Sequence, residues 1–197
     1  MNTFIVAAVL HVFLCSLLVQ SAPISSPSDL PPAFREAAAQ AKTLVEKILR
    51  DIPAVHGATV NTEGLTLDPS TQTENLQMMA TTLRIPAAPV LKPLSERFTL
   101  DVCVSRMAAG SRLYQGLLGV LSESLDGLTD LQADLRDLLM NINKMKEAAQ
   151  LSSSSEDQNL DFHPQGNFEV QVAIHLTLKQ LRSFCHDLIR SLRAVRS

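Results

Sequence analysis

Histidines are the first candidates for chemistry, because a metal site or a hydrolytic centre needs polar groups that converge. Beyond the N-terminal segment they are His56, His163, His175 and His186, and none belongs to a His-x3-His or His-Glu-x-x-His pattern that would hold zinc. The chain also lacks a Gly-x-Ser-x-Gly motif and a glycine-rich phosphate loop. We therefore expect no catalytic residue, no metal site, no cofactor and no enzymatic activity.

Charged residues at helical spacing form a second set of candidates. The acidic set is Asp130, Asp134, Asp137 and Asn141. The mixed set is Lys42, Glu46, Lys47 and Arg50. Steps of three and four place each set on the outer side of a helix, where charges can recognise a protein partner. The alternative is a solvated helix face with no partner.

The elements that would position these charges are helices. Aromatic residues make up only 4% of the chain, there is no Trp, and long stretches lack both Gly and Pro. Apolar residues recur at steps of three and four in four windows, which predicts helices over about 32–52, 95–122, 128–149 and 168–196. Pro32 suits a first turn, and Pro53 is expected to end the first helix.

The lengths of the connections indicate how these helices are arranged. The second link, about six polar residues with Asp126-Gly127, is so short that it predicts antiparallel neighbours. The first and third links, about 40 and about 17 residues, can each travel the length of a bundle. The fold expected is all-α, a four-helix bundle of up-up-down-down topology with two long crossover connections.

The N-terminus resembles a secretory signal peptide. Residues 1–22 carry no charged side chain and include a short apolar run, and we expect cleavage after Ser21 or Ala22. A retained membrane anchor is the alternative. The remaining residues, 23–197, predict one secreted domain, and no later segment is long and apolar enough to span a membrane. The net charge of -3 leaves no basic surface for phosphates, so we expect neither nucleic acid nor a membrane as a partner.

Two cysteines remain beyond the apolar N-terminal run, Cys103 and Cys185. In an up-up-down-down bundle both fall at roughly the same distance from one end, which permits a disulfide between them. Two buried free thiols that pack as small apolar residues are the alternative.

Four motifs resemble one protein family. Within the second helix, Cys103 is followed by Gly110 and by Leu113-Tyr-Gln-Gly-Leu-Leu118. The others are Leu30-Pro-x-x-Phe34, Ile85-Pro-x-Ala-Pro89 and Leu131-Gln-x-Asp134-x-x-Asp137. In this order they resemble the interleukin-6, granulocyte colony-stimulating factor and myelomonocytic growth factor family, of which the chain looks like a divergent vertebrate member.

The chain also departs from the family pattern. The family usually closes two small disulfide loops, and of those four cysteines only Cys103 is present; Pro93 stands where its partner would be. Ala87 occupies a position where a family member has Trp. We therefore expect the receptor contacts to differ from those of other family members.

The resemblance implies a long-chain cytokine that acts outside the cell. Such a growth factor binds two chains of a class I cytokine receptor, resembling the granulocyte colony-stimulating factor receptor, and promotes proliferation, survival and differentiation of granulocyte and myeloid precursors. Receptor-binding residues implied by motif are Asp134 and Asp137, with Asp130 beside them; Lys42, Glu46 and Lys47 are inferred from exposure, and Glu74 or Asn75 from a looser match to a second receptor surface. We expect a monomer when free.

Two other interpretations stay open. An interleukin-6-like cytokine with a different receptor would share the fold. A lipid-binding amphipathic helical protein would share the composition, although the chain lacks the proline-punctuated repeats of that class and its last helix has a narrow apolar seam.

Overall fold

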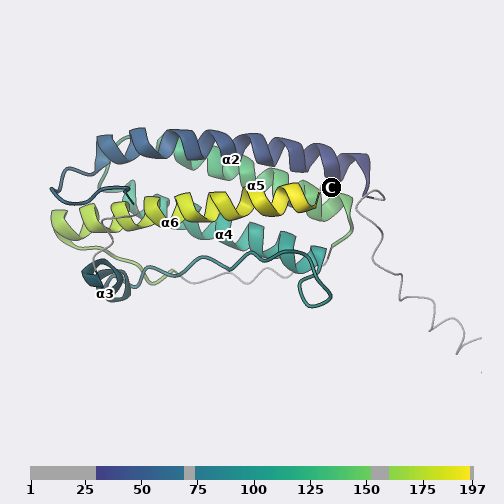
Figure 1. Cartoon of the computed structure of the whole chain (residues 1–197). Coiled ribbons are helices and arrows are strands. Elements are labelled where there is room, and N and C mark those ends of the chain that lie inside the picture. Colours follow the sequence, from purple (N-terminus) through teal and green to yellow (C-terminus); the bar gives the residue numbers. More distant parts are fainter. Residues whose placement is uncertain (1–29, 69–73, 152–159, 196–197) are drawn as a thin grey trace, which may run out of the picture. The chain divides into compact units, whose positions relative to one another are not determined.

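The protein is all-helical in the part of the chain that the structure describes. The computed structural model describes residues 30–68, 74–151 and 160–195, so the expected signal peptide lies outside the described residues. The helices are α2 (Pro32–Thr59), α3 (Glu74–Thr82), α4 (Leu100–Leu121), α5 (Thr129–Ala148) and α6 (Gly166–Ala194), as Figure 1 shows. All five lie in the unit Pro31–Ser197, and the described residues form no strand.

Helix α2 confirms the expected apolar spacing but not the expected end. The side chains at the core steps, Phe34, Ala38, Ala41, Val45, Ile48 and Ile52, are fully buried. The prediction that Pro53 ends this helix is wrong, because α2 continues to Thr59. Proline removes one backbone donor from the helix, and burial of His56 and Thr59 offsets that loss.

Helix α4 begins later than the sequence predicted, at Leu100 and not near residue 95. Ser95 and Phe98 exchange two backbone hydrogen bonds, 3.0 and 3.1 Å long, which hold this segment in a tight turn. The hydroxyl of Thr99 then accepts a hydrogen bond from the backbone N–H of Val102. A side-chain cap of this kind favours a helix start at the next residue.

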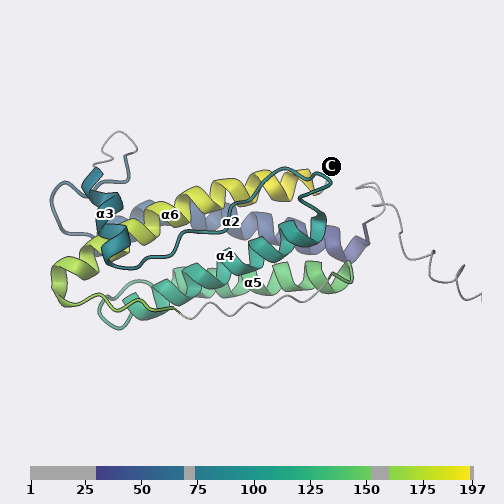
Figure 2. The same cartoon turned by 90° about the horizontal axis from the view of Figure 1, so that it is seen from below.

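Each of the four long helices packs against two of the others. Helix α2 contacts α5 and α6, α4 contacts the same two helices, and α2 and α4 do not contact each other. The view in Figure 2 shows α4 beside α5 and the short helix α3 at one end of α6. The core therefore lies between the helices, with α5 and α6 each serving both α2 and α4.

Helix α6 is the most enclosed element. Every residue from Val170 to Leu178 is buried, including the polar side chains of Gln171, His175 and Thr177. Further along, Phe184 packs against Tyr114 with ring centroids 5.4 Å apart. The ring of Phe184 occupies the space that a side chain at Gly110 would need: a Cβ there would lie 2.2 Å from a ring carbon.

Replacing Gly110 with Ala is expected to destabilise the protein despite the higher helix propensity of alanine. The added methyl group must displace the Phe184 ring, and overpacking of this kind costs about 1–3 kcal/mol, against a propensity gain of about 1 kcal/mol. Gly119 is the matched control, since a Cβ there meets nothing within 4 Å. Urea denaturation should show a lower free energy of unfolding for Gly110→Ala and an equal or higher one for Gly119→Ala; equal effects would contradict this packing.

Candidate functional site

The expected acidic stripe on α5 is divided between solvent and the helix interface. Asp130 and Asp137 are exposed, as expected. Asp134 retains only 13% side-chain exposure, and Asn141 is buried, so its assignment to an outer face is wrong. The Nδ2 of Asn141 donates to the backbone carbonyl of Asp137. Packing of α2 against α5 covers one edge of the stripe, which leaves the other edge free.

Lys47 of α2 pairs with the partly buried Asp134 of α5. Its Nζ forms an ion pair with Asp134 and a second one, 3.1 Å long, with Asp51. The pKa of Lys47 is raised above its usual value, first by the hydrogen bond to Asp134 and second by the hydrogen bond to Asp51. Two residues expected to contact a partner separately are therefore joined to each other across the α2–α5 interface.

Lys42 and Glu46 occupy another side of α2. They form an ion pair of 3.0 Å with each other, and Glu46 is exposed. At 3.6 residues per turn, this pair is centred about 140° around the helix from the pair Lys47 and Asp51. Arg50 lies between Glu46 and Lys47 around the helix, so the mixed set follows one broad arc of α2, and Lys47 at one edge of that arc meets α5.

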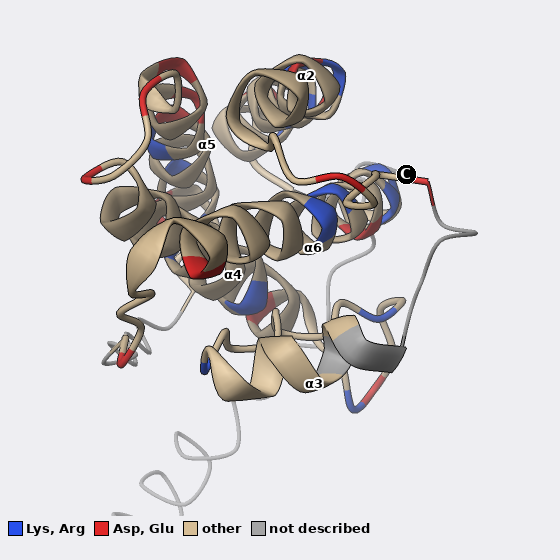
Figure 3. Ribbon diagram, turned by 90° about the vertical axis from the view of Figure 1, so that its left-hand side faces the viewer, with Lys and Arg blue, Asp and Glu red and all other residues tan. Residues whose placement is uncertain are grey.

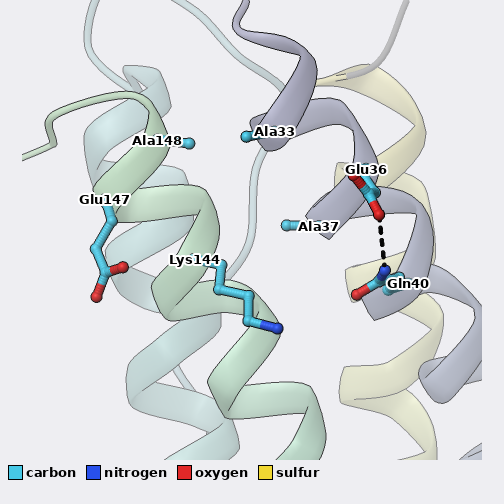
Figure 4. Close-up of a pocket in the computed structure, with 7 residues that line it drawn as sticks. All are labelled: Ala33, Glu36, Ala37, Gln40, Lys144, Glu147 and Ala148. Atoms are coloured by element: carbon cyan, nitrogen blue, oxygen red, sulfur yellow. Dashed lines mark hydrogen bonds between the residues drawn. The ribbon is translucent and has the colours of Figure 1, made fainter.

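A groove lies between the first turns of α2 and the last turns of α5. It has a volume of about 480 Å³ and is lined by Ala33, Glu36, Ala37, Gln40, Lys144, Glu147 and Ala148. In Figure 4 the alanines leave the space between the helices open, while Lys144 extends from α5 toward α2. Gln40 donates to Glu36 over 3.3 Å at the rim. The groove thus combines a floor of short side chains with charged edges.

Sequence reasoning did not identify the groove or its exposed neighbour Met140. Met140 is 48% exposed, and it follows Asp137 by three residues and precedes Lys144 by four, which places all three on one side of α5. The available signal was the alanine-rich start of the first helix and a methionine outside the leucine steps. Glu74 and Asn75 belong to the first turn of α3, and their side chains lie outside the described part of the structure.

The two cysteines are free and buried, so the disulfide hypothesis is not supported and the alternative of two thiols holds in this structure. Cys103 makes a hydrogen-bond contact with Ser191, whereas Cys185 follows Phe184, the residue that packs on Gly110. Ser191 and Cys185 are six residues apart on α6, about 9 Å along its axis. That separation exceeds what a disulfide can span.

The described residues offer little for other kinds of site. They contain no cluster of three metal-ligating side chains and no helix with the length and apolar character to cross a bilayer. Neither a known family model nor a curated protein matches the chain. The α2–α5 face is therefore the candidate functional site, on its geometry alone.

The Lys47–Asp134 pair is expected to show a coupling of about 0.5–1 kcal/mol in a double-mutant cycle with Lys47→Ala and Asp134→Asn. Partial burial of Asp134 reduces solvent screening relative to an exposed pair. The Lys42–Glu46 pair within α2 is the matched control, with an expected coupling of about 0.3–0.5 kcal/mol. Denaturant unfolding of the four proteins in each cycle measures both values; no coupling between Lys47 and Asp134 would contradict the interhelical contact.

Neither buried thiol should react with a thiol reagent while the protein is folded. Burial raises the pKa of Cys103 to about 11 and that of Cys185 to about 12, so the reactive thiolate is scarce and inaccessible. Peptide mapping should find both cysteines unmodified in native protein and labelled after denaturation without a reductant. Detection of a peptide pair linked through Cys103 and Cys185 would contradict the free thiols and support the disulfide hypothesis.

Proposed function

We propose that this protein is a secreted cytokine that binds and dimerises a class I cytokine receptor. The receptor is of the granulocyte colony-stimulating factor receptor type, and the response is proliferation, survival and differentiation of granulocyte and myeloid precursors. The motifs resembling the interleukin-6 and granulocyte colony-stimulating factor family support this assignment. The observation that carries the proposal furthest is the α2–α5 face, where a groove, an exposed methionine and exposed carboxylates lie on adjacent turns.

The proposal includes the up-up-down-down topology of such cytokines. Contacts between α2 and α6 support it, since His56 meets His175 and the later Thr59 meets the earlier Gln171. The same reversal relates α2 to α5, because the start of α2 and the end of α5 line one groove. If α2 runs antiparallel to both α5 and α6, then α5 and α6 run parallel to each other.

Helix α4 supports the same order. Cys103 near its start contacts Ser191 near the end of α6, while the later Tyr114 packs on the earlier Phe184. At the other end of α4, the side chain of Gln132 donates to the carbonyl of Leu118 over 2.7 Å, across the short link to α5. Helices α2 and α4 would then run in one direction and α5 and α6 in the other.

The receptor surface we propose consists of the groove together with Asp130, Asp137 and Met140. In the end-on view of Figure 3, acidic residues follow the outer side of α5. Met140 would supply the apolar contact that binding hot spots require, and the carboxylates would pair with basic receptor residues. Asp134 would act mainly through its pairing with Lys47, which fixes α5 against α2.

Signalling needs no chemistry from the ligand itself. One receptor chain would bind the α2–α5 face, and a second chain would bind near α3, where Glu74 and Asn75 lie. Holding two receptor chains together raises the local concentration of their cytoplasmic tails, so that associated kinases can phosphorylate each other. Binding energy and geometry are then sufficient for activity.

Asp137→Arg is expected to raise the half-maximal concentration for receptor signalling about tenfold, which corresponds to about 1.4 kcal/mol. The reversed charge would face basic receptor residues and leave the fold intact, since Asp137 is exposed. Phosphorylation of the receptor-coupled transcription factor, in cells that carry only this receptor, provides the measurement.

Glu96→Arg is the matched control, because it makes the same change in charge at an exposed residue ahead of α4, a helix that does not contact α2. It should signal like the wild type. Equal loss in both variants would argue against the α2–α5 face. A silent but folded wild-type protein would remove the receptor assignment and favour an interleukin-6-like ligand with another receptor.

A further inference from the structure

Two histidines meet in the interior where α2 ends against α6. The Nε2 of His56 lies 2.9 Å from the Nδ1 of His175, and the ring centroids are 5.2 Å apart. His175 is fully buried and His56 is 8% exposed. One nitrogen at this contact must donate and the other must accept, so at least one of the two rings has to be neutral for the hydrogen bond to exist.

The end of α2 depends on few contacts besides this one. Only His56 and Thr59 are buried between Pro53 and Thr59. One turn before His175, the Gln171 side chain donates to the carbonyl of Thr59 over 2.9 Å and accepts from the N–H of Asn61 over 2.6 Å. Because Pro53 has no N–H, the helix lacks one backbone hydrogen bond where this segment begins.

We propose that the His56–His175 contact is an acid-sensitive latch that holds the segment 53–61 against α6 at neutral pH and releases it at acidic pH while the remaining helices stay folded. Adding one proton places a charge in the interior. Adding a second directs two N–H groups at each other and breaks the hydrogen bond. The hydrogen bonds of Gln171 and the burial of Thr59 then remain to hold the segment.

The surroundings offer no compensation for that charge. Lys179, one turn further along α6, is the charged group that acts on His175, and it opposes protonation. Among the described residues, no carboxylate from α2, α3, α4 or α5 contributes to the pKa of either ring. The Nε2 of His175 is also buried without a hydrogen-bond partner. Protonation therefore costs more in the closed segment than in water.

The direction of the pH dependence follows from these contacts. Burial, then the neighbouring His56, lowers the pKa of His175 from 6.5 to about 4, and burial lowers that of His56. The neutral pair contributes its full stability above about pH 6.5 and loses it as the pH falls toward about 4. For His175 alone, protonation increases the open fraction roughly 25-fold between about pH 7.4 and about pH 5.

Hydrogen exchange measured by mass spectrometry tests the latch in the whole protein. After correction for the intrinsic rate at each pH, the segment 53–61 should exchange roughly 25-fold faster at about pH 5 than at about pH 7.4, whereas the core of α5 should not change. Equal corrected rates at the two pH values would overturn the proposal. Equal acceleration throughout the helices would also overturn it, since that would indicate global unfolding.

The double variant His56→Gln with His175→Asn provides the sharper comparison. Gln Nε2 and Asn Oδ1 can take the places of the two contacting ring nitrogens, so a hydrogen bond is retained and no group titrates. The pH step in exchange should disappear. His186→Asn, at an exposed position on α6, is the control and should keep the step. A step that persists in the double variant would contradict the assignment to this pair.

A titration of the wild-type imidazole resonances by NMR keeps the test independent of whether the double variant folds. The His175 ring should titrate well below pH 6.5, and exchange of 53–61 should accelerate as the pH falls from about 6.5 toward the pKa of that ring. A native His175 that titrates at or above 6.5 would overturn the latch.

Discussion

Complete burial of α6 from Val170 to Leu178 is the constraint on which the remaining structure depends. A helix enclosed on all sides requires neighbours on every face, and here α2, α3 and α4 all contact it. Farther along α6, the Phe184 ring occupies the space that a side chain at Gly110 would need, so α4 approaches α6 closely there.

The polar side chains buried on α6 affect both the length of α2 and the response of the protein to acid. Gln171 and His175 are hydrogen-bonded to the end of α2, which allows α2 to continue beyond Pro53. The same arrangement places the His56–His175 pair where no carboxylate among the described residues contributes to the pKa of either ring. Stability at neutral pH and sensitivity to acid therefore arise from one set of contacts. The free cysteines lie in the core as well, where they contribute apolar contacts in place of a covalent link.

At the other end of α2, short side chains create the surface that we assign to recognition. Ala33, Ala37 and Ala148 leave a groove where α2 and α5 meet. Farther along the same interface, Lys47 and Asp134 fill the space between the helices and neutralise each other. One helix pair thus has an open end suited to a partner and a closed stretch that fixes the geometry. Asp137 and Met140 adjoin both regions on the outer side of α5.

The sequence by itself determined the helical class and most of the core. Steps of three and four predicted the buried side of α2 from Phe34 to Ile52, because a helix returns to the same face with that period. Periodicity, however, shows only which side of a single helix a residue occupies. Which edge of α5 is covered by α2 depends on how the two helices pack, so Asp134 and Asn141 could not be distinguished from Asp137.

Tertiary structure also decided the features that join distant segments. Proline propensity alone predicted that α2 would stop at Pro53, but contacts with Gln171 and His175, more than a hundred residues later, stabilise its last turns. Helix register likewise placed Cys103 level with Ser191 and away from Cys185. The groove, the Lys47–Asp134 pair and the histidine contact all require two helices at a defined offset, and local sequence carries no information on that offset.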